Sequence, residues 1–163
     1  MDEVIYILIG IGLALVITLL VRRFLFFVAI ISSNSMLPTL KPRNRVLAKK
    51  IYNYSKIKRG DIIIFYSNEY NEKMIKRVIG IPGDLVEIRG NGDLYINRNK
   101  IDEPYVHYND GLSGAYRVPE NKYFFLGDNR QQSTDSRHWE DKYISENDLT
   151  GKVIIGANRT KKK

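Results

Sequence analysis

The hydrophobic pattern separates one long apolar segment from a series of short ones. Residues 4–21 carry no charge and are rich in Ile, Leu and Val. At about 1.5 Å per residue, a helix of this length nearly crosses a hydrocarbon core of roughly 30 Å. The segment therefore predicts one transmembrane helix. A cleaved signal peptide is the alternative, but the start, Met1-Asp2-Glu3, lacks a basic n-region, and the apolar run exceeds a usual h-region.

A second apolar run covers residues 24–31, directly after Arg22 and Arg23. It is too short to cross a bilayer and is rich in β-branched and aromatic residues, which favours a buried strand. The alternative is that the anchor continues through the two arginines.

Beyond residue 40, short apolar runs alternate with turn signals, and the sequence shows neither a βαβ rhythm nor a repeat. This pattern predicts a mainly β fold: an antiparallel β-sheet domain with one N-terminal transmembrane helix. We expect a tail and anchor over 1–23 and a β domain over 24–163, with 85–119 as a possible small cap or side lobe. The expected strands are residues 46–48, 62–65, 75–79, 85–88, 94–96, 123–126 and 153–155.

The charge and residue content of the chain limit the kinds of partner that it is expected to bind. Lys and Arg number 26 against 18 Asp and Glu, a net charge of +8, and such a surface favours anionic lipid or nucleic acid. Aromatic residues are not interleaved with the basic ones as an RNA platform requires, so we expect membrane lipids as partners and no nucleic acid. Cysteine is absent, which excludes disulfides and cysteine-ligated metal. We expect neither a metal nor a cofactor.

The candidate nucleophile is Ser35, which follows the second apolar run and precedes Pro38 by three positions. A hydroxyl of normal pKa needs a neighbouring base. The two histidines, His107 and His138, do not stand in a setting that resembles a triad, and Lys76 is the better partner.

Four sequence blocks resemble the type I signal peptidases, the membrane-anchored serine proteases that remove signal peptides from exported proteins. They stand in that family's order and at similar spacings. The blocks are Ser35-Met36-Leu37-Pro38-Thr39-Leu40, Arg59-Gly60-Asp61-Ile62-Ile63-Ile64-Phe65, Lys76-Arg77-Val78-Ile79-Gly80-Ile81-Pro82-Gly83-Asp84, and Gly127-Asp128-Asn129-Arg130 with Ser133, Asp135, Ser136 and Arg137.

The resemblance implies a Ser/Lys dyad. Ser35 would attack the scissile carbonyl, and Lys76 would take its proton and pass it to the leaving amine. Ser133 would orient the lysine through a hydrogen bond. The Ser35 backbone N–H and the Ser33 hydroxyl would hold the oxyanion. Asn34 stands where the family often has Gly, so the oxyanion geometry is less firmly implied than the dyad.

The lysine must be neutral at rest, although a solvated lysine has a pKa near 10.4. Burial disfavours the ammonium, and the apolar neighbours Met74, Ile75, Val78 and Ile79 could provide it. The alternative is a snorkelling surface lysine.

The resemblance also assigns supporting residues and a substrate. Structural ion pairs are implied for Asp128, Arg130, Asp135 and Arg137. The substrate would be a signal peptide of a secreted preprotein, with small residues at positions −1 and −3, laid as a strand against residues 29–33 and 73–75. The expected pocket wall is Ile31, Met36, Leu40 and Ile75, with Met36 as its floor.

Charge and resemblance disagree on orientation. Asp2 and Glu3 precede the apolar segment and two arginines follow it, so the positive-inside rule places the β domain in the cytoplasm. The resemblance places it outside, on a single-pass cell-membrane anchor, and we follow it.

Two other functions compete: a catalytically silent peptide-binding or assembly module for surface proteins, and a self-cleaving Ser/Lys regulator. A silent binding module would not need to keep both Ser35 and Lys76. A self-cleaving regulator would carry a DNA-binding domain in place of the membrane anchor.

Overall fold

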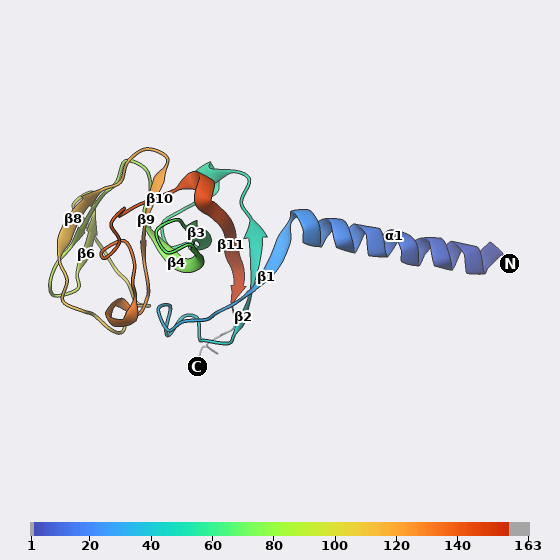
Figure 1. The fold of residues 1–163 in the computed structure, drawn as a ribbon, viewed down its shortest axis with the longest axis horizontal. Helices are drawn as coiled ribbons and strands as arrows, with labels where there is room; N and C mark the ends of the chain where they lie inside the picture. The colour runs from blue at the N-terminus through green and yellow to red at the C-terminus, as the bar shows by residue number, and fades with distance from the viewer. Residues whose placement is uncertain (1, 157–163) are drawn as a thin grey trace.

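The structure, a computed structural model, describes residues 2–156. One long helix precedes a domain of β-strands (Figure 1). The elements are α1 (Asp2–Phe24), β1 (Phe26–Ile30), β2 (Arg45–Lys50), β3 (Ile62–Ser67), β4 (Glu72–Gly80), β5 (Leu85–Ile88), β6 (Leu94–Ile96), β7 (Asn99–Ile101), β8 (Gly114–Arg117), β9 (Lys122–Leu126), β10 (Ile144–Ser145) and β11 (Leu149–Gly156), with short 3-10 turns at Tyr54–Lys56, Arg130–Gln132 and Glu146–Asp148.

Helix α1 projects away from the β domain (Figure 1), and its apolar core, with a mean hydropathy of 3.0, is not covered by other parts of the chain. It is long and apolar enough to cross a membrane. The helix extends past the expected residues 4–21 and continues through both arginines to Phe24. Lys50 Nζ donates to the Arg23 carbonyl at 2.6 Å, and Tyr52 donates to the Phe24 carbonyl at 2.5 Å. These bonds attach the helix end to the domain.

The main sheet has seven antiparallel strands in the order β1-β2-β11-β3-β4-β9-β10. The fold class expected from the sequence is confirmed. An aromatic core packs on this sheet. In it, Phe65 of β3 stacks on Phe125 of β9 with ring centres 4.6 Å apart and meets Trp139 edge-on at 5.8 Å. The fully buried Trp139 shows that the segment after β9 folds back over the sheet.

The prediction of a buried strand over residues 24–31 is wrong in two respects. The strand begins at Phe26, because α1 takes up the start of the run. It is also only half buried: Val28 and Ile30 are 61% and 65% exposed, whereas Ala29 packs against the core. Alternate side chains of a strand point to opposite faces, and only one face of β1 meets the core. β1 is also an edge strand that pairs with β2 alone.

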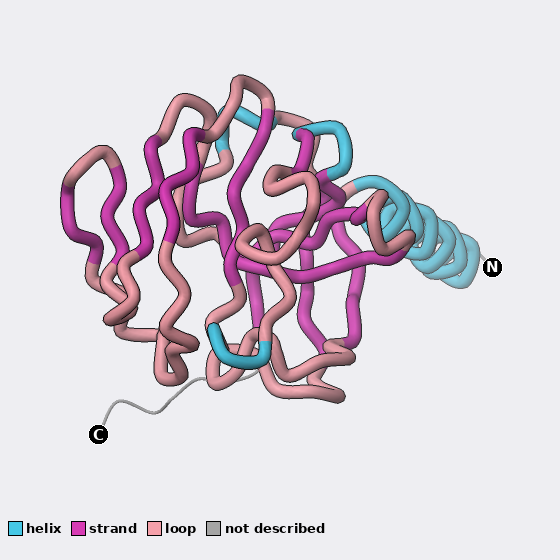
Figure 2. The backbone as a smooth tube through the Cα atoms, turned by 60° about the vertical axis from the view of Figure 1, so that its left-hand side comes forward, coloured by secondary structure: helices cyan, strands magenta, loops and turns pink. Residues whose placement is uncertain are grey.

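A second sheet, in the order β7-β6-β5-β8, lies at the end of the molecule opposite α1 (Figures 1 and 2). It falls within residues 85–119, where a side lobe is expected, and the division into domains stays a prediction. Its apolar face shares a core with Phe124 and Leu126 of β9. β7 and β8 are joined by residues 102–113, which run outside both sheets apart from one bridge between Tyr108 and Asn129.

Candidate active site

Ser35 lies in the turn that follows β1, and its side chain is buried. The loop after β9 holds the main chain at this point: the Asn129 N–H donates to the Ser35 carbonyl at 3.0 Å, and the Asn129 side chain donates to the Asn34 carbonyl at 3.3 Å. The loop approaches closely because residue 127 is Gly. A Cβ there would lie 2.5 Å from the Ser35 carbonyl oxygen. The Gly127 block therefore fixes the nucleophile's backbone.

Lys76 reaches Ser35 from the middle of β4. Its Nζ donates to Ser35 Oγ at 2.7 Å, and only 5% of the residue is exposed. Burial lowers the pKa of Lys76 to about 8; Asp135 and Glu72 oppose this shift, and Arg137 adds to it. The sequence left open whether Lys76 is buried or is a snorkelling surface side chain; the structure has it buried and facing Ser35. At pH 7 a group of this pKa is neutral in about a tenth of molecules.

Two more serines were expected at the site. Ser33 Oγ lies 3.2 Å from Ser35 Oγ, so the two hydroxyls can share a hydrogen bond. Ser133 is buried, but its hydroxyl makes no hydrogen bond in the described structure, so the bond expected from it to Lys76 is not formed. Lys76 Nζ donates to Ser35 instead. Ser133 Oγ lies beside Gly127, where a Cβ would come within 2.2 Å of it.

Neither histidine contacts Ser35. His138 Nδ1 lies 3.7 Å from Asp135, and His107 lines a separate cavity beside the second sheet. Within residues 2–156 no group of three or more His, Asp or Glu side chains is placed to hold a metal ion.

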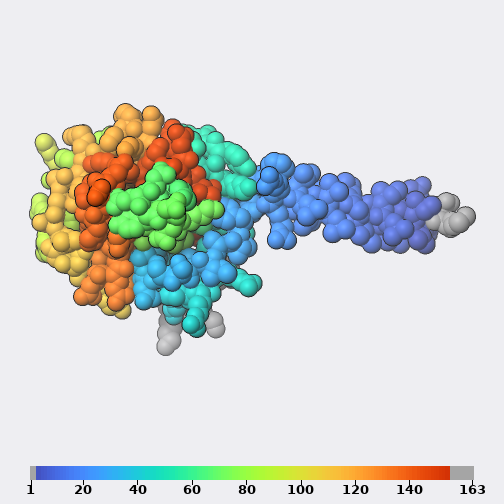
Figure 3. Space-filling model, in the orientation of Figure 1, coloured from blue at the N-terminus to red at the C-terminus, as the bar shows by residue number. Residues whose placement is uncertain are grey.

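A cleft of about 390 Å³ opens beside Ser35 and Lys76. In Figure 3 the surface of the β3–β4 hairpin (green) borders the segment after β1 (light blue). The cleft is lined by Ala29, Ile30, Ile31, Ser32, Ser33, Ser35, Ile64, Glu72, Lys73, Met74, Ile75, Lys76, Gln132 and Thr134.

Two of the four expected pocket residues, Ile31 and Ile75, line this cleft, and two do not. Met36 and Leu40 are buried in the core formed with Val46, so Met36 is no pocket floor. The turn after Ser35 directs both side chains inward, where the Leu40 N–H donates to the Met36 carbonyl at 2.8 Å. Ile64 and Met74 take part in the wall instead.

The four residues expected to form ion pairs are all buried. Two of them pair with each other inside the loop, and the other two pair with residues outside it. Only Asp135 and Arg137 pair within the loop, with two bonds of 2.8 Å. Burial alone would raise the pKa of Asp135, yet the neighbouring His138 and the hydrogen bonds from Arg137 hold it well below its usual range. Asp135 also accepts from the Gly127 N–H at 3.0 Å. This pair closes the loop next to Lys76.

The other two charges reach out of the loop. Asp128 accepts two bonds from Arg77, at 2.7 and 2.5 Å, and a third from Thr39 at 2.5 Å. Arg130 donates to Glu103 at 2.6 Å. Because Arg77 and Thr39 are neighbours of Lys76 and of the Ser35 turn, Asp128 joins the strand of the base to the turn of the nucleophile.

Sequence reasoning missed several contact residues. Glu103 and Asp110 pair with loop arginines, and the Tyr105 ring lies over Arg77 with the guanidinium carbon 3.9 Å from its centre. They stand outside the four blocks, in a stretch with no regular period. Only the tertiary fold brings them to the loop.

Comparisons with known proteins bear on this geometry. A model of the family described as "Signal peptidase, peptidase S26" matches residues 4–156. The chain belongs to the S26 signal peptidase family. It is a serine endopeptidase, and α1 fits the membrane anchoring found in this family.

Individual relatives agree. Signal peptidase I P of Bacillus subtilis subsp. natto is 42% identical over 79% of this chain and 75% of its own. Signal peptidase IB of Staphylococcus aureus is 38% identical over 90% of this chain and 85% of its own. The crystal structure of a signal peptidase I from Enterococcus faecalis is similar with a TM-score of 0.53 and 34% identity, covering 61% of this chain and 97% of that one.

Proposed function

We propose that this peptidase removes signal peptides from exported preproteins, with Ser35 as nucleophile and Lys76 as base. The observation that carries the proposal is the 2.7 Å bond between Lys76 Nζ and Ser35 Oγ, made by a lysine whose burial lowers its pKa to about 8. A lysine in that range is neutral often enough to accept a proton at physiological pH, which a solvated lysine is not.

The mechanism follows from the donor and acceptor positions. Ser35 Oγ attacks the scissile carbonyl carbon while Lys76 Nζ takes its proton, and the same proton passes to the leaving amine when the C–N bond breaks. Lys76 then deprotonates a water that releases the acyl group from Ser35. The Ser33 hydroxyl, 3.2 Å from Ser35 Oγ, and the Ser35 backbone N–H would stabilise the oxyanion.

The cleft suits an extended peptide. On one side is the free edge of β1 with the segment up to Ser33 that follows it. On the other is the part of β4 over residues 72–76, which pairs with β3 only, since pairing with β9 begins at Arg77. An added strand could bond to both edges. Ile31, Ile75 and Met74 leave shallow space, which favours small side chains at positions −1 and −3.

The anchor supports the same substrate. Only β1 and a turn separate α1 from Ser35, so the cleft lies near the membrane that α1 crosses. A signal peptide held in that bilayer could extend directly into the cleft. We place the β domain on the extracytoplasmic side, where exported preproteins arrive.

The direct test is cleavage of a signal-peptide-bearing preprotein by purified full-length variants. Ser35→Ala and Lys76→Ala should each lower kcat/KM by at least 10³-fold, because nucleophile and base act as a unit. Ser55→Ala and Lys58→Ala, on exposed residues outside the cleft, should cleave like the wild type. Substantial cleavage by either site variant, with folding verified by circular dichroism, would refute the assignment.

A further inference from the structure

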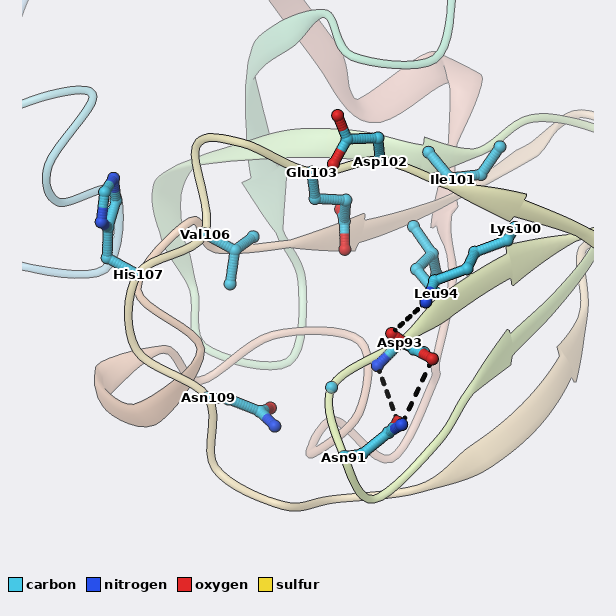
Figure 4. A pocket seen from close by; sticks show the side chains of 11 residues that line it. Asn91, Asp93, Leu94, Lys100, Ile101, Asp102, Glu103, Val106, His107 and Asn109 are labelled. Atoms are coloured by element: carbon cyan, nitrogen blue, oxygen red, sulfur yellow. Dashed lines mark hydrogen bonds and ion pairs between the residues drawn. The ribbon is translucent and has the colours of Figure 1, made fainter.

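Residues 102–113, here called the strap, join β7 to β8 and lie between two different environments. On one side a cavity of about 550 Å³ separates the strap from the β6–β7 hairpin (Figure 4). On the other side the strap packs against the loop 127–137. Because the strap makes no sheet pairing beyond one bridge, its contacts with that loop are its main support. The same contacts also support the loop 127–137.

The first end of the strap binds one loop arginine and the strand of the base. Glu103 accepts from Arg130 at 2.6 Å, and both side chains are nearly fully buried. Arg130 in turn donates to the Gly127 carbonyl at 3.0 Å. The Tyr105 hydroxyl donates to Glu103 at 2.7 Å, and its ring covers the guanidinium of Arg77. The strap thus touches the loop at its start and β4 next to Lys76.

The second end binds the far part of the loop. Asp110 accepts from Arg137 at 2.5 Å, and Arg137 also holds Asp135. Between the two ends, Tyr108 makes the bridge to Asn129, the residue whose N–H donates to the Ser35 carbonyl. Each of these contacts of the strap with the loop or with β4 therefore lies one residue or one bond away from a group near the dyad.

We propose that the strap is a positioning element of the peptidase, in which Glu103 and Asp110 hold the loop 127–137 closed over Lys76 and so keep the lysine dry. This inference rests on the proposed function and names positioning residues for it. Gln132 and Thr134 of the loop line the cleft together with Lys76, so a loop that lifts admits water to the base.

The physical reason is the buried charge of the loop arginines. Without Glu103, the guanidinium of Arg130 has no carboxylate partner, and a buried unpaired charge is strongly unfavourable. We expect the buried guanidinium of Arg130 to move towards water, and the loop that carries it to move with it. Hydration of Lys76 then restores the pKa of the lysine towards that of a free side chain.

The charged residues that face Lys76 are not themselves substituted in such a variant. They are Glu72 on its own strand and Asp135 and Arg137 on the loop, while β3 opposite presents the apolar Ile63. Asp135 raises the pKa of Lys76 and Arg137 lowers it, so the effects of these two charges oppose each other when they move together with the loop.

The test is the pH dependence of kcat/KM for full-length Glu103→Gln and Asp110→Asn with a preprotein. We expect the alkaline limb to move up by about one pH unit, so that activity falls about ten-fold at pH 7 but approaches the wild-type value near pH 10. Glu103→Asp, which keeps the carboxylate, should restore most of the wild-type profile. The control is Asp93→Asn in the same lobe, whose partner Lys100 is exposed, and it should leave the profile unchanged.

A limb at the wild-type pH in both strap variants would overturn the proposal, even if activity were lower, because reduced folding scales the curve without moving it. If Glu103→Gln fails to fold, Asp110→Asn gives the same readout, since Arg137 keeps Asp135 as a partner. The proposed function fails separately, if wild-type activity survives Ser35→Ala.

Discussion

The buried ammonium group of Lys76 lowers the stability of the folded protein at neutral pH. The pKa near 8 lies about 2.5 below the ordinary value of 10.5 for a lysine, and each pKa unit corresponds to about 1.4 kcal/mol. The folded state therefore loses about 3 kcal/mol at neutral pH relative to a lysine of normal pKa. The sign follows from proton uptake. Below pH 8 both states hold the proton and the loss is complete; between 8 and 10.5 only the unfolded chain holds it, so stability rises with pH.

Lys76→Met should consequently stabilise the domain at pH 7, by up to about 3 kcal/mol, because it removes the buried ammonium and keeps an apolar side chain of similar length. Denaturant unfolding at pH 7 and at pH 10.5 measures this. The gain should shrink at the higher pH. Lys58→Met, on an exposed lysine, should show neither effect. A destabilised Lys76→Met at pH 7 would contradict a strained lysine.

Single residues were predictable where a local block carries them. Ser35 and Lys76 stand in short blocks whose order and spacing are visible in the sequence. The apolar neighbours of Lys76 could provide burial but did not decide between a buried and a surface lysine. Met36 and Leu40 were not predictable, because the turn that directs them into the core has no periodic pattern. The hydroxyl of Ser133 depends on packing against Gly127, which no spacing reveals.

At the scale of elements, apolar runs predicted the strands that carry a buried face. The expected runs at 62–65, 85–88 and 94–96 all fall within observed strands. β7, β8 and β10 escaped prediction because they are two to four residues long and largely polar, and only pairing with neighbours makes them strands.

Pairing between elements is what the sequence could not supply. Structural ion pairs were expected for Asp128 and Arg130, but the sequence did not identify their partners, which are Arg77 of β4 and Glu103 of the strap. Such partners depend on strand order, in which β4 lies between β3 and β9. The same order leaves residues 72–76 of β4 free on one side, which is the feature that suits an added peptide strand.

In the whole molecule, α1 and the lobe of β5–β8 lie at opposite ends, with the main sheet between them (Figure 1). The arginines that end α1 would favour a cytoplasmic β domain by charge alone. An exported substrate requires the opposite orientation. The fold does not depend on this choice, so only an experiment on membranes decides it.

Protease added to intact spheroplasts should digest the chain after Phe24, because we place the β domain outside. Immunoblotting of an epitope at the C-terminus follows the loss. A cytoplasmic protein is the control for intact spheroplasts, and it should survive until lysis. If the epitope is protected in sealed spheroplasts and digested only after lysis, the positive-inside rule holds and our orientation is wrong.

If Lys76 acts as the base for Ser35, the pH dependence of wild-type kcat/KM on a preprotein reports the titration of this lysine. We expect an alkaline limb, with activity rising through a pKa of about 8, and no recovery in Lys76→Arg, whose guanidinium cannot release its proton in this range. A limb near 6.5, the usual pKa of histidine, or an active Lys76→Arg enzyme would show that Lys76 is not the base.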